Sequence, residues 1–147
     1  MIVFGWNGCR EDDVTMPPVH QTKLKLTDFT SAQVCSSCHP NHFNEWNGSM
    51  HHYATNDPIW MNSINSLQSS TNGKLKDWCW QCHSPIGFLT GNAPSTFQFS
   101  DLDPIVREGV TCDVCHSMLP PHTTTNQTIA YNIKPGRTKY GPLSDAV

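Results

Sequence analysis

Cys35-Ser36-Ser37-Cys38-His39 is the first of three copies of one five-residue pattern, and the others are Cys79-Trp80-Gln81-Cys82-His83 and Cys112-Asp113-Val114-Cys115-His116. Cys-x-x-Cys-His is the attachment motif of c-type haem, in which two thiols form thioethers with the porphyrin and the imidazole is the proximal iron ligand. The three copies use six of the seven cysteines. We therefore predict three covalently attached haem c groups, bound through Cys35, Cys38, Cys79, Cys82, Cys112 and Cys115, with His39, His83 and His116 as proximal ligands.

Other uses of paired cysteines explain this pattern less well. Zinc sites made of two Cys-x-x-Cys pairs are usually about 15–20 residues apart, and zinc gives no reason for a histidine after every pair. A thioredoxin-like redox motif needs a βαβ context, and no parallel-strand pattern surrounds the three copies. A disulfide framework predicts neither the histidine nor the repeat.

The composition predicts one domain, or a piece of one, that buries little apolar surface by itself. Of 147 residues, 37% are hydrophobic and 14% are charged. Porphyrins bonded to the chain would provide large flat apolar groups around which short segments could wrap. We therefore expect a mainly α fold of short helices and long loops around the haems, with little β-structure and little conventional hydrophobic core. Without haem the chain should fold poorly.

Charge and hydropathy exclude some classes of protein. The formal net charge is −3, and the nine lysines and arginines are scattered without a basic stripe, so we expect no nucleic-acid partner. No apolar run has the length of about 20 residues that a transmembrane helix needs. Covalent haem attachment takes place outside the cytoplasm, so we expect a periplasmic or cell-surface protein.

The chain divides into four expected segments. Residues 1–9 are interpreted as a truncated signal or lipoprotein leader, because Gly8-Cys9 resembles the end of a lipoprotein signal. Cys9 would then carry a lipid anchor; the alternative is an incidental free thiol. Residues 10–26 are expected to be a linker, 27–142 the multihaem domain, and 143–147 the start of a missing C-terminal part.

Local signals predict the helices. We expect Thr27 to Thr30 to cap a short helix that carries the first motif, and Pro40 to begin a second short helix. Asp57-Pro58 should begin a longer helix that ends at about Ser69. Its apolar face would consist of Ile59, Trp60, Ile64 and Leu67. Asn72-Gly73 should end that helix. We expect a helix from Lys74 to His83, a loop from Ser84 to Asp103, a helical turn at the third motif and a short strand within Thr128 to Ile133.

Histidines outside the motifs are candidates for the second axial iron position. His51 is the first candidate. Its neighbour His52 would point about 100° away on a helix, so the two could serve different haems, and the alternative for His52 is a surface or propionate-bonding role. His20 and His122 lie near proline-rich stretches and could fold over a haem or remain exposed. His42 follows His39 on one helical face, and we expect it at the surface. Met50, Met61 and Met118 are further candidates, although the spare histidines favour bis-histidine coordination.

A resemblance covers about Phe29 to Pro142. It rests on Cys35-Ser-Ser-Cys-His39-Pro40 followed by Phe43, Trp46 and Ser49-Met-His51-His-Tyr-Ala54, on Cys79-Trp-Gln-Cys-His83-Ser-Pro85-Ile-Gly87, on Glu108-Gly-Val-Thr-Cys112-Asp-Val-Cys-His116, and on Lys139-Tyr-Gly-Pro-Leu143. These combinations resemble the multihaem cytochrome c family typified by the tetrahaem cytochrome c of ammonia-oxidising bacteria. The resemblance implies that His51 is an axial ligand. It also implies further haem motifs downstream, which this sequence does not contain.

Three functions are compatible with these residues. The leading hypothesis is an exported multihaem c-type cytochrome that relays single electrons between other cytochromes or redox proteins, with no catalytic residues of its own. The first alternative is a multihaem reductase or oxidase of small nitrogen or sulfur compounds, with one five-coordinate haem. The second is a haem subunit of a conducting assembly. Spin state discriminates between them, because an enzyme needs an iron with a vacant or weakly held position. The sequence leaves the oligomeric state open.

Overall fold

The computed structural model describes residues 24–75, 77–119, 123–125 and 128–141. Short helices dominate this part of the chain: α1 (Ala32–Cys35), α2 (Pro40–Asn47), α3 (Met50–Asn56), α4 (Pro58–Ser70), α5 (Trp80–His83), α6 (Pro85–Leu89) and α7 (Cys112–His116). Single 3-10 turns occur at Leu26–Asp28, Phe99–Asp101 and Val106–Glu108. Strands β1 (Thr123–Thr125) and β2 (Thr128–Ala130) form an antiparallel hairpin in which Thr124 is opposite Ile129. The expected mainly α class with little β-structure is confirmed.

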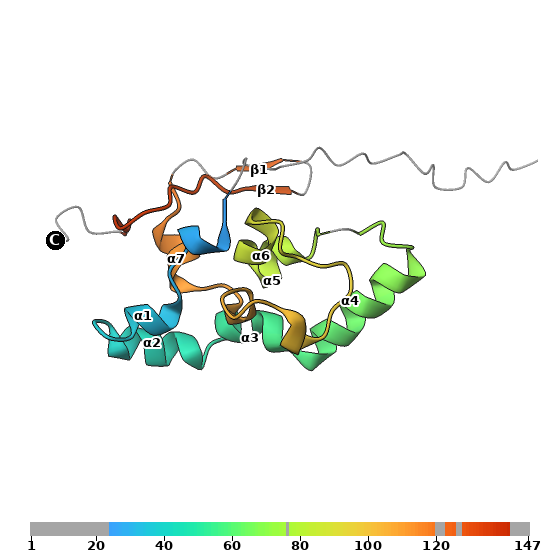
Figure 1. The fold of residues 1–147 in the computed structure, drawn as a ribbon, viewed down its shortest axis with the longest axis horizontal. Helices are drawn as coiled ribbons and strands as arrows, with labels where there is room; N and C mark the ends of the chain where they lie inside the picture. Colours follow the sequence, from blue (N-terminus) through green and yellow to red (C-terminus); the bar gives the residue numbers. More distant parts are fainter. Residues whose placement is uncertain (1–23, 76, 120–122, 126–127, 142–147) are drawn as a thin grey trace, which may run out of the picture.

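Helix α3 occupies the centre of the arrangement. Helices α1 to α4 follow one another along one side of the molecule, with α5 and α6 above α3 and α7 above α1 (Figure 1). Helix α3 contacts α2, α4, α5 and the turn at Val106–Glu108. It therefore contacts both the second Cys-x-x-Cys-His motif, on α5, and the turn that precedes the third motif.

The starts of three helices follow from local chemistry. Pro40 and Pro58 stand in the first turns of α2 and α4, where a missing N–H costs nothing. The Asp57 side chain accepts a hydrogen bond from the Ile59 N–H at 2.8 Å and caps α4. At the first motif the expected cap was wrong, because Leu26–Asp28 form a 3-10 turn and Ser31 caps α1 by accepting from the Gln33 N–H at 3.1 Å.

Helix α4 agrees with its predicted limits, and only part of its apolar face is buried. It ends at Ser70, before Asn72 and Gly73 adopt positive φ angles of 51° and 75°. Trp60 and Ile64 face the core, whereas Ile59 and Leu67 are exposed. At the other end of the chain, strand β2 occupies the first half of the expected Thr128 to Ile133 strand, and Ile133 forms an isolated bridge with Met118.

Two predictions around the second motif were wrong. The helix expected from Lys74 to His83 is limited to α5, because i to i+3 turns precede it, such as the bond from the Trp80 N–H to the Asp77 carbonyl at 3.0 Å. The loop expected from Ser84 to Asp103 contains α6 and a 3-10 turn. Ser84 and Pro85 are a helix start, since the Ser84 Oγ accepts from the Gly87 N–H at 3.4 Å.

The core of the described residues is small and aromatic. The indole of Trp60 meets that of Trp80 edge-on at 5.1 Å, and Phe97 packs against both rings. Asn65 holds Phe97 in place through two hydrogen bonds to its backbone, of 2.9 and 3.1 Å. Residues of α6 and the segments leading to α7 complete the cluster, which lies behind the second motif. None of the helices in the described part of the chain is long and apolar enough to cross a membrane.

Gly109 allows α3 to approach the third motif closely. Its φ is +67°, and a Cβ at this position would collide with the His51 carbonyl oxygen. The same oxygen accepts a hydrogen bond from the Val110 N–H at 2.9 Å. The glycine therefore fixes the distance between α3 and the segment that leads to Cys112.

We predict that Gly109→Ala will destabilise the haem-loaded protein by about 1–3 kcal/mol, because it combines a strained φ with a backbone clash. Urea denaturation followed by circular dichroism measures the change. Gly48→Ala is the matched control, since Gly48 has a φ of −92° and room for a methyl group. Equal stability of the two variants would contradict the close approach.

Candidate functional site

In the second and third motifs the two thiols and the imidazole stand on one short helical stretch, whereas in the first motif only Cys35 is helical and His39 is the N-cap of α2. In the first motif the His39 N–H donates to the Cys35 carbonyl at 2.9 Å, and in the second the His83 N–H donates to the Cys79 carbonyl at 3.2 Å. In the third motif all five residues form α7. Residues at i, i+3 and i+4 share one helical face, so the two thiols and the imidazole of the second motif, and those of the third, point to the same side. That is the arrangement one porphyrin needs.

The motif thiols are free, and burial makes several of them less acidic. All six motif cysteines are unpaired, with Cys38, Cys82 and Cys115 exposed. Burial raises the pKa values of the Cys35, Cys79 and Cys112 thiols. Reactive disulfide-exchange cysteines have lowered pKa values, because the thiolate is the nucleophile. The site therefore does not resemble a dithiol oxidoreductase.

His83 is held in the orientation of a metal ligand. Its Nδ1 lies 2.6 Å from the carbonyl oxygen of Ala54, near the end of α3, where helix carbonyls lack intrahelical partners. The Thr55 Oγ1 donates to the His83 carbonyl at 2.6 Å. Nδ1 can act here only as the donor, which leaves Nε2 with its lone pair for iron. The indole of Trp60 stacks on the imidazole at 4.3 Å and 11° and restricts its rotation.

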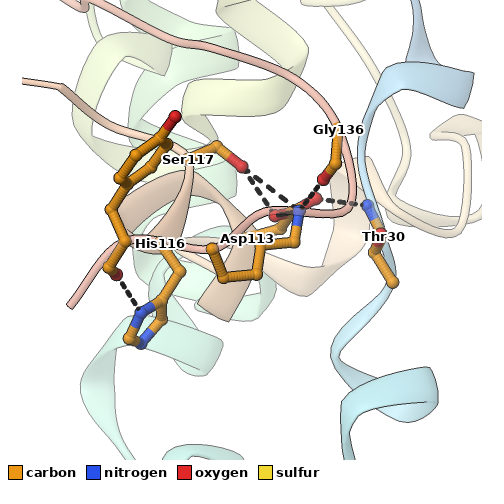
Figure 2. A network of polar contacts seen from close by, with 7 residues as sticks. Thr30, Asp113, His116, Ser117 and Gly136 are labelled. Carbon is orange, nitrogen blue, oxygen red and sulfur yellow. Dashed lines mark hydrogen bonds and ion pairs between the residues drawn. The ribbon is translucent and has the colours of Figure 1, made fainter. Parts of the chain in front are cut away.

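His116 is held in the same way by a different element. Its Nδ1 lies 2.6 Å from the carbonyl oxygen of Tyr140 (Figure 2). The Tyr140 N–H donates back to the His116 carbonyl at 2.7 Å. Nε2 of His116 is therefore also left free for a metal. The ring of His39 has no such carbonyl partner among the described residues; its recorded neighbour is the His42 ring, at 6.2 Å.

The first and third motifs share one cavity. It has a volume of about 420 Å³ and is lined by residues of both motifs and by 139–141: Cys35, His39, His42, Phe43, Cys112, Asp113, His116, Lys139, Tyr140 and Gly141. A volume of this size is typical of small-molecule and cofactor sites. Cys35, the last residue of α1, and Cys112, the first residue of α7, both line the cavity, and the two helices are in contact. Residues of the two motifs therefore fit apolar groups attached side by side, and the sequence spacing did not reveal this pairing.

Glu108 joins the first and third motifs. Its carboxylate accepts hydrogen bonds from the Ser31 hydroxyl, from the Ala32 N–H at 3.0 Å and from the Thr111 hydroxyl at 2.9 Å. Ser31 and Ala32 begin α1, and Thr111 precedes α7. One carboxylate thus fixes both helix starts, although the sequence indicated no such role.

The structure places the candidate distal ligands His51 and His52 on α3. Nδ1 of His52 lies 3.0 Å from the carbonyl oxygen of Asn47, the last residue of α2, and its ring packs against Trp46 at 4.4 Å. Trp46 is fixed in turn, because its Nε1–H donates to the Val110 carbonyl at 2.8 Å. The His51 side chain is exposed, while its carbonyl is bound by Val110. Both rings are free to accept a metal at Nε2.

Other candidates are distributed differently. His42 is exposed and pairs with Glu45 at 3.6 Å, and it also lines the cavity beside His39. Met61 and Met118 pack against the core, whereas Met50 is exposed. Three residues with an expected role are outside the described part of the chain: the candidate ligands His20 and His122, and Cys9, the expected lipid site. In the described ranges, no three His, Cys, Asp or Glu side chains converge as ligands of a bare metal ion.

Comparison with known proteins agrees with the motif geometry. A family model described as cytochrome c554 and c-prime matches residues 34–117, which is more than half of the chain and includes all three motifs. Neither the curated proteins nor the solved structures contain a significant match.

Proposed function

The chain belongs to the cytochrome c554 and c-prime family, and from this premise we propose that it is an exported carrier of three covalent haem groups that relays single electrons between redox proteins. Membership of this family makes the chain a c-type cytochrome with covalently bound haem c. The number of haems, the export and the relay role are the proposal. Haem iron, when bound, supplies a one-electron redox couple.

The observation that carries the proposal is the shared orientation of the proximal histidines. Nδ1 of His83 and of His116 is bound to a backbone carbonyl at 2.6 Å, so Nε2 of each ring is directed away from the protein backbone. The free thiols Cys79 and Cys82, and Cys112 and Cys115, stand on the same helical face as these rings. The residues present therefore fit the attachment of two haems, and the first motif has the same order of residues, Cys35, Cys38 and His39, without a carbonyl partner for the imidazole among the described residues.

The residues also fit a relay rather than an isolated redox site. Cys35 and Cys112 line one cavity together with His39 and His116, so groups on the first and third motifs would be close neighbours. Helix α3 links the second motif, through Ala54 and Thr55, to the third motif, through the bond between His51 and Val110. We assign two of the three distal positions to His51 and His52, and His20 and His122 are the candidates for the third. Short separations between redox groups are what electron transfer requires.

Export follows in this proposal from the haem chemistry, since covalent attachment takes place outside the cytoplasm. The partners would be other cytochromes or redox proteins. A lipid anchor at Cys9 would keep the protein at a membrane surface.

We predict three haems per chain after expression in a host with the c-type maturation machinery. A pyridine haemochrome assay gives the haem count, and intact mass gives both covalent loading and lipidation. Cys79→Ser/Cys82→Ser should lose one haem, whereas Ser36→Ala, within the first motif, should lose none. A wild-type count below three would contradict the proposed loading.

The spin state of the oxidised protein tests the relay role. Low-spin iron at every site, without response to cyanide, hydroxylamine or nitrite, is the expected result, because histidine would occupy both axial positions. A high-spin fraction that binds hydroxylamine or nitrite would contradict the carrier and support catalysis at an open iron.

A further inference from the structure

Residues 132–141, here called the strap, lie across the third motif and are attached to it at several points. The Leu119 N–H donates to the Asn132 carbonyl at 2.7 Å, and the Lys134 N–H donates to the Ser117 carbonyl at 2.8 Å. Tyr140 makes the last attachment: its N–H donates to the His116 carbonyl, and its own carbonyl accepts a hydrogen bond from His116 Nδ1. The strap therefore supplies the atom that orients the proximal imidazole.

A buried carboxylate fixes the end of the strap. Asp113 has no exposed side-chain surface and accepts hydrogen bonds from the Thr30 N–H at 2.6 Å and from the Ser117 hydroxyl at 2.7 Å. Its charge is paired with the Lys139 ammonium, which also donates to the Gly136 carbonyl at 2.8 Å (Figure 2). Removing the cation would leave a buried charge without compensation, which is strongly unfavourable. The ion pair is thus a firm anchor one residue before Tyr140.

The two proximal histidines with a carbonyl partner differ in how that carbonyl is held. The Ala54 carbonyl bound to His83 belongs to α3 and is fixed by the helix. The Tyr140 carbonyl bound to His116 belongs to an irregular segment, which is held by backbone hydrogen bonds and by the ion pair between Lys139 and Asp113. Only the third site therefore has a ligand orientation that a distant side chain could control.

We propose that Lys139 is a positioning residue that lowers the reduction potential of the haem on the third motif. By holding the Tyr140 carbonyl on His116 Nδ1, Lys139 keeps the imidazole a strong electron donor, and a stronger donor stabilises oxidised iron. The inference rests on the proposed haem at this motif. The strap would then have a function in the relay: of the two haems that share the cavity, the one on the third motif would have the lower reduction potential.

The sign of the effect separates this role from simple electrostatics. A cation near haem favours the reduced form, so loss of its charge alone would lower the potential. Loss of the orienting hydrogen bond would raise the potential, since the imidazole would donate less. Lys139→Met removes the charge and the anchor together. We expect the positioning effect to dominate.

The experiment is a redox titration of the haem-loaded protein, followed by NMR signals of the three haems. For Lys139→Met we expect the reduction potential of the haem on the third motif to rise by about 59 mV. For a one-electron couple this equals a tenfold change in the ratio of oxidised to reduced haem at a given potential. The Tyr140 amide should also exchange faster with solvent. Lys139→Arg should restore both values. Lys134→Met is the matched control, because it removes the same charge from an exposed position on the strap.

A second variant covers the case in which the buried charge prevents folding. Lys139→Met/Asp113→Asn removes both charges, and the same rise is expected because the anchor is still absent. An unchanged or lower potential for the third haem in either variant, with three haems attached, would overturn the inference and leave the proposed function intact. A wild-type protein without covalent haem at the third motif would contradict the proposed function itself.

Discussion

Expressed without the haem-attachment machinery, the chain will show no cooperative unfolding transition. The described core is small, and the cavity of about 420 Å³ between the first and third motifs would contain only water. The free energy of unfolding of a domain is only about 5–15 kcal/mol. Without the large apolar haem groups, the chain loses more stabilisation by apolar burial than its remaining core can offset. Circular dichroism during a urea titration, with tryptophan fluorescence as a second probe, measures the transition.

The matched control is the same chain with haem attached, which should unfold cooperatively at a higher urea concentration. Cys79→Ser/Cys82→Ser, produced with the machinery present, should still unfold cooperatively but at a lower urea concentration than the fully loaded protein, because two haems and the aromatic core remain. A sharp transition in the chain without haem, seen at the same urea concentration by both probes, would contradict the view that haem is part of the folded structure.

The sequence alone was sufficient for the parts of the fold that depend on neighbouring residues. Pro40 and Asp57-Pro58 predicted the starts of α2 and α4, and Asn72-Gly73 predicted the end of α4. The same local rules misplaced the cap of α1 and overlooked α6. At α6, a serine N-cap and a first-turn proline outweigh the glycine that follows, because packing buries the whole helix.

The rest of the site depends on contacts between distant residues. Two of the three motifs share a cavity because Glu108 joins the starts of α1 and α7 and Thr30 binds Asp113. The partners of His83 and His116 are backbone carbonyls, which every residue possesses, so no residue type could indicate them. Lys139-Tyr140 stood out in the sequence only through the family resemblance.

Removal of a distal ligand should have the largest effect on the iron itself. His51→Ala is expected to convert one haem from six-coordinate low-spin to high-spin iron, because the second axial position loses its imidazole. His51 suits this role, since its ring is exposed on α3 while its carbonyl fixes the helix to the third motif through Val110. Backbone contacts position the helix, so loss of the side chain should change coordination without unfolding the protein.

Electron paramagnetic resonance of the oxidised protein gives the number of high-spin haems, and cyanide titration gives the number of open positions. His51→Ala should have one high-spin haem and one open axial position. His52→Ala should also have one of each, but on a different haem, because adjacent residues on a helix point about 100° apart. His42→Ala is the matched control, since His42 lines the cavity but stands in the first turn of α2, directly after its N-cap, the proximal ligand His39. If all haems of His51→Ala stay low-spin, another residue supplies the axial ligand assigned to His51. If His51→Ala and His52→Ala convert the same haem to high-spin iron, the position of α3, rather than either imidazole, controls the coordination.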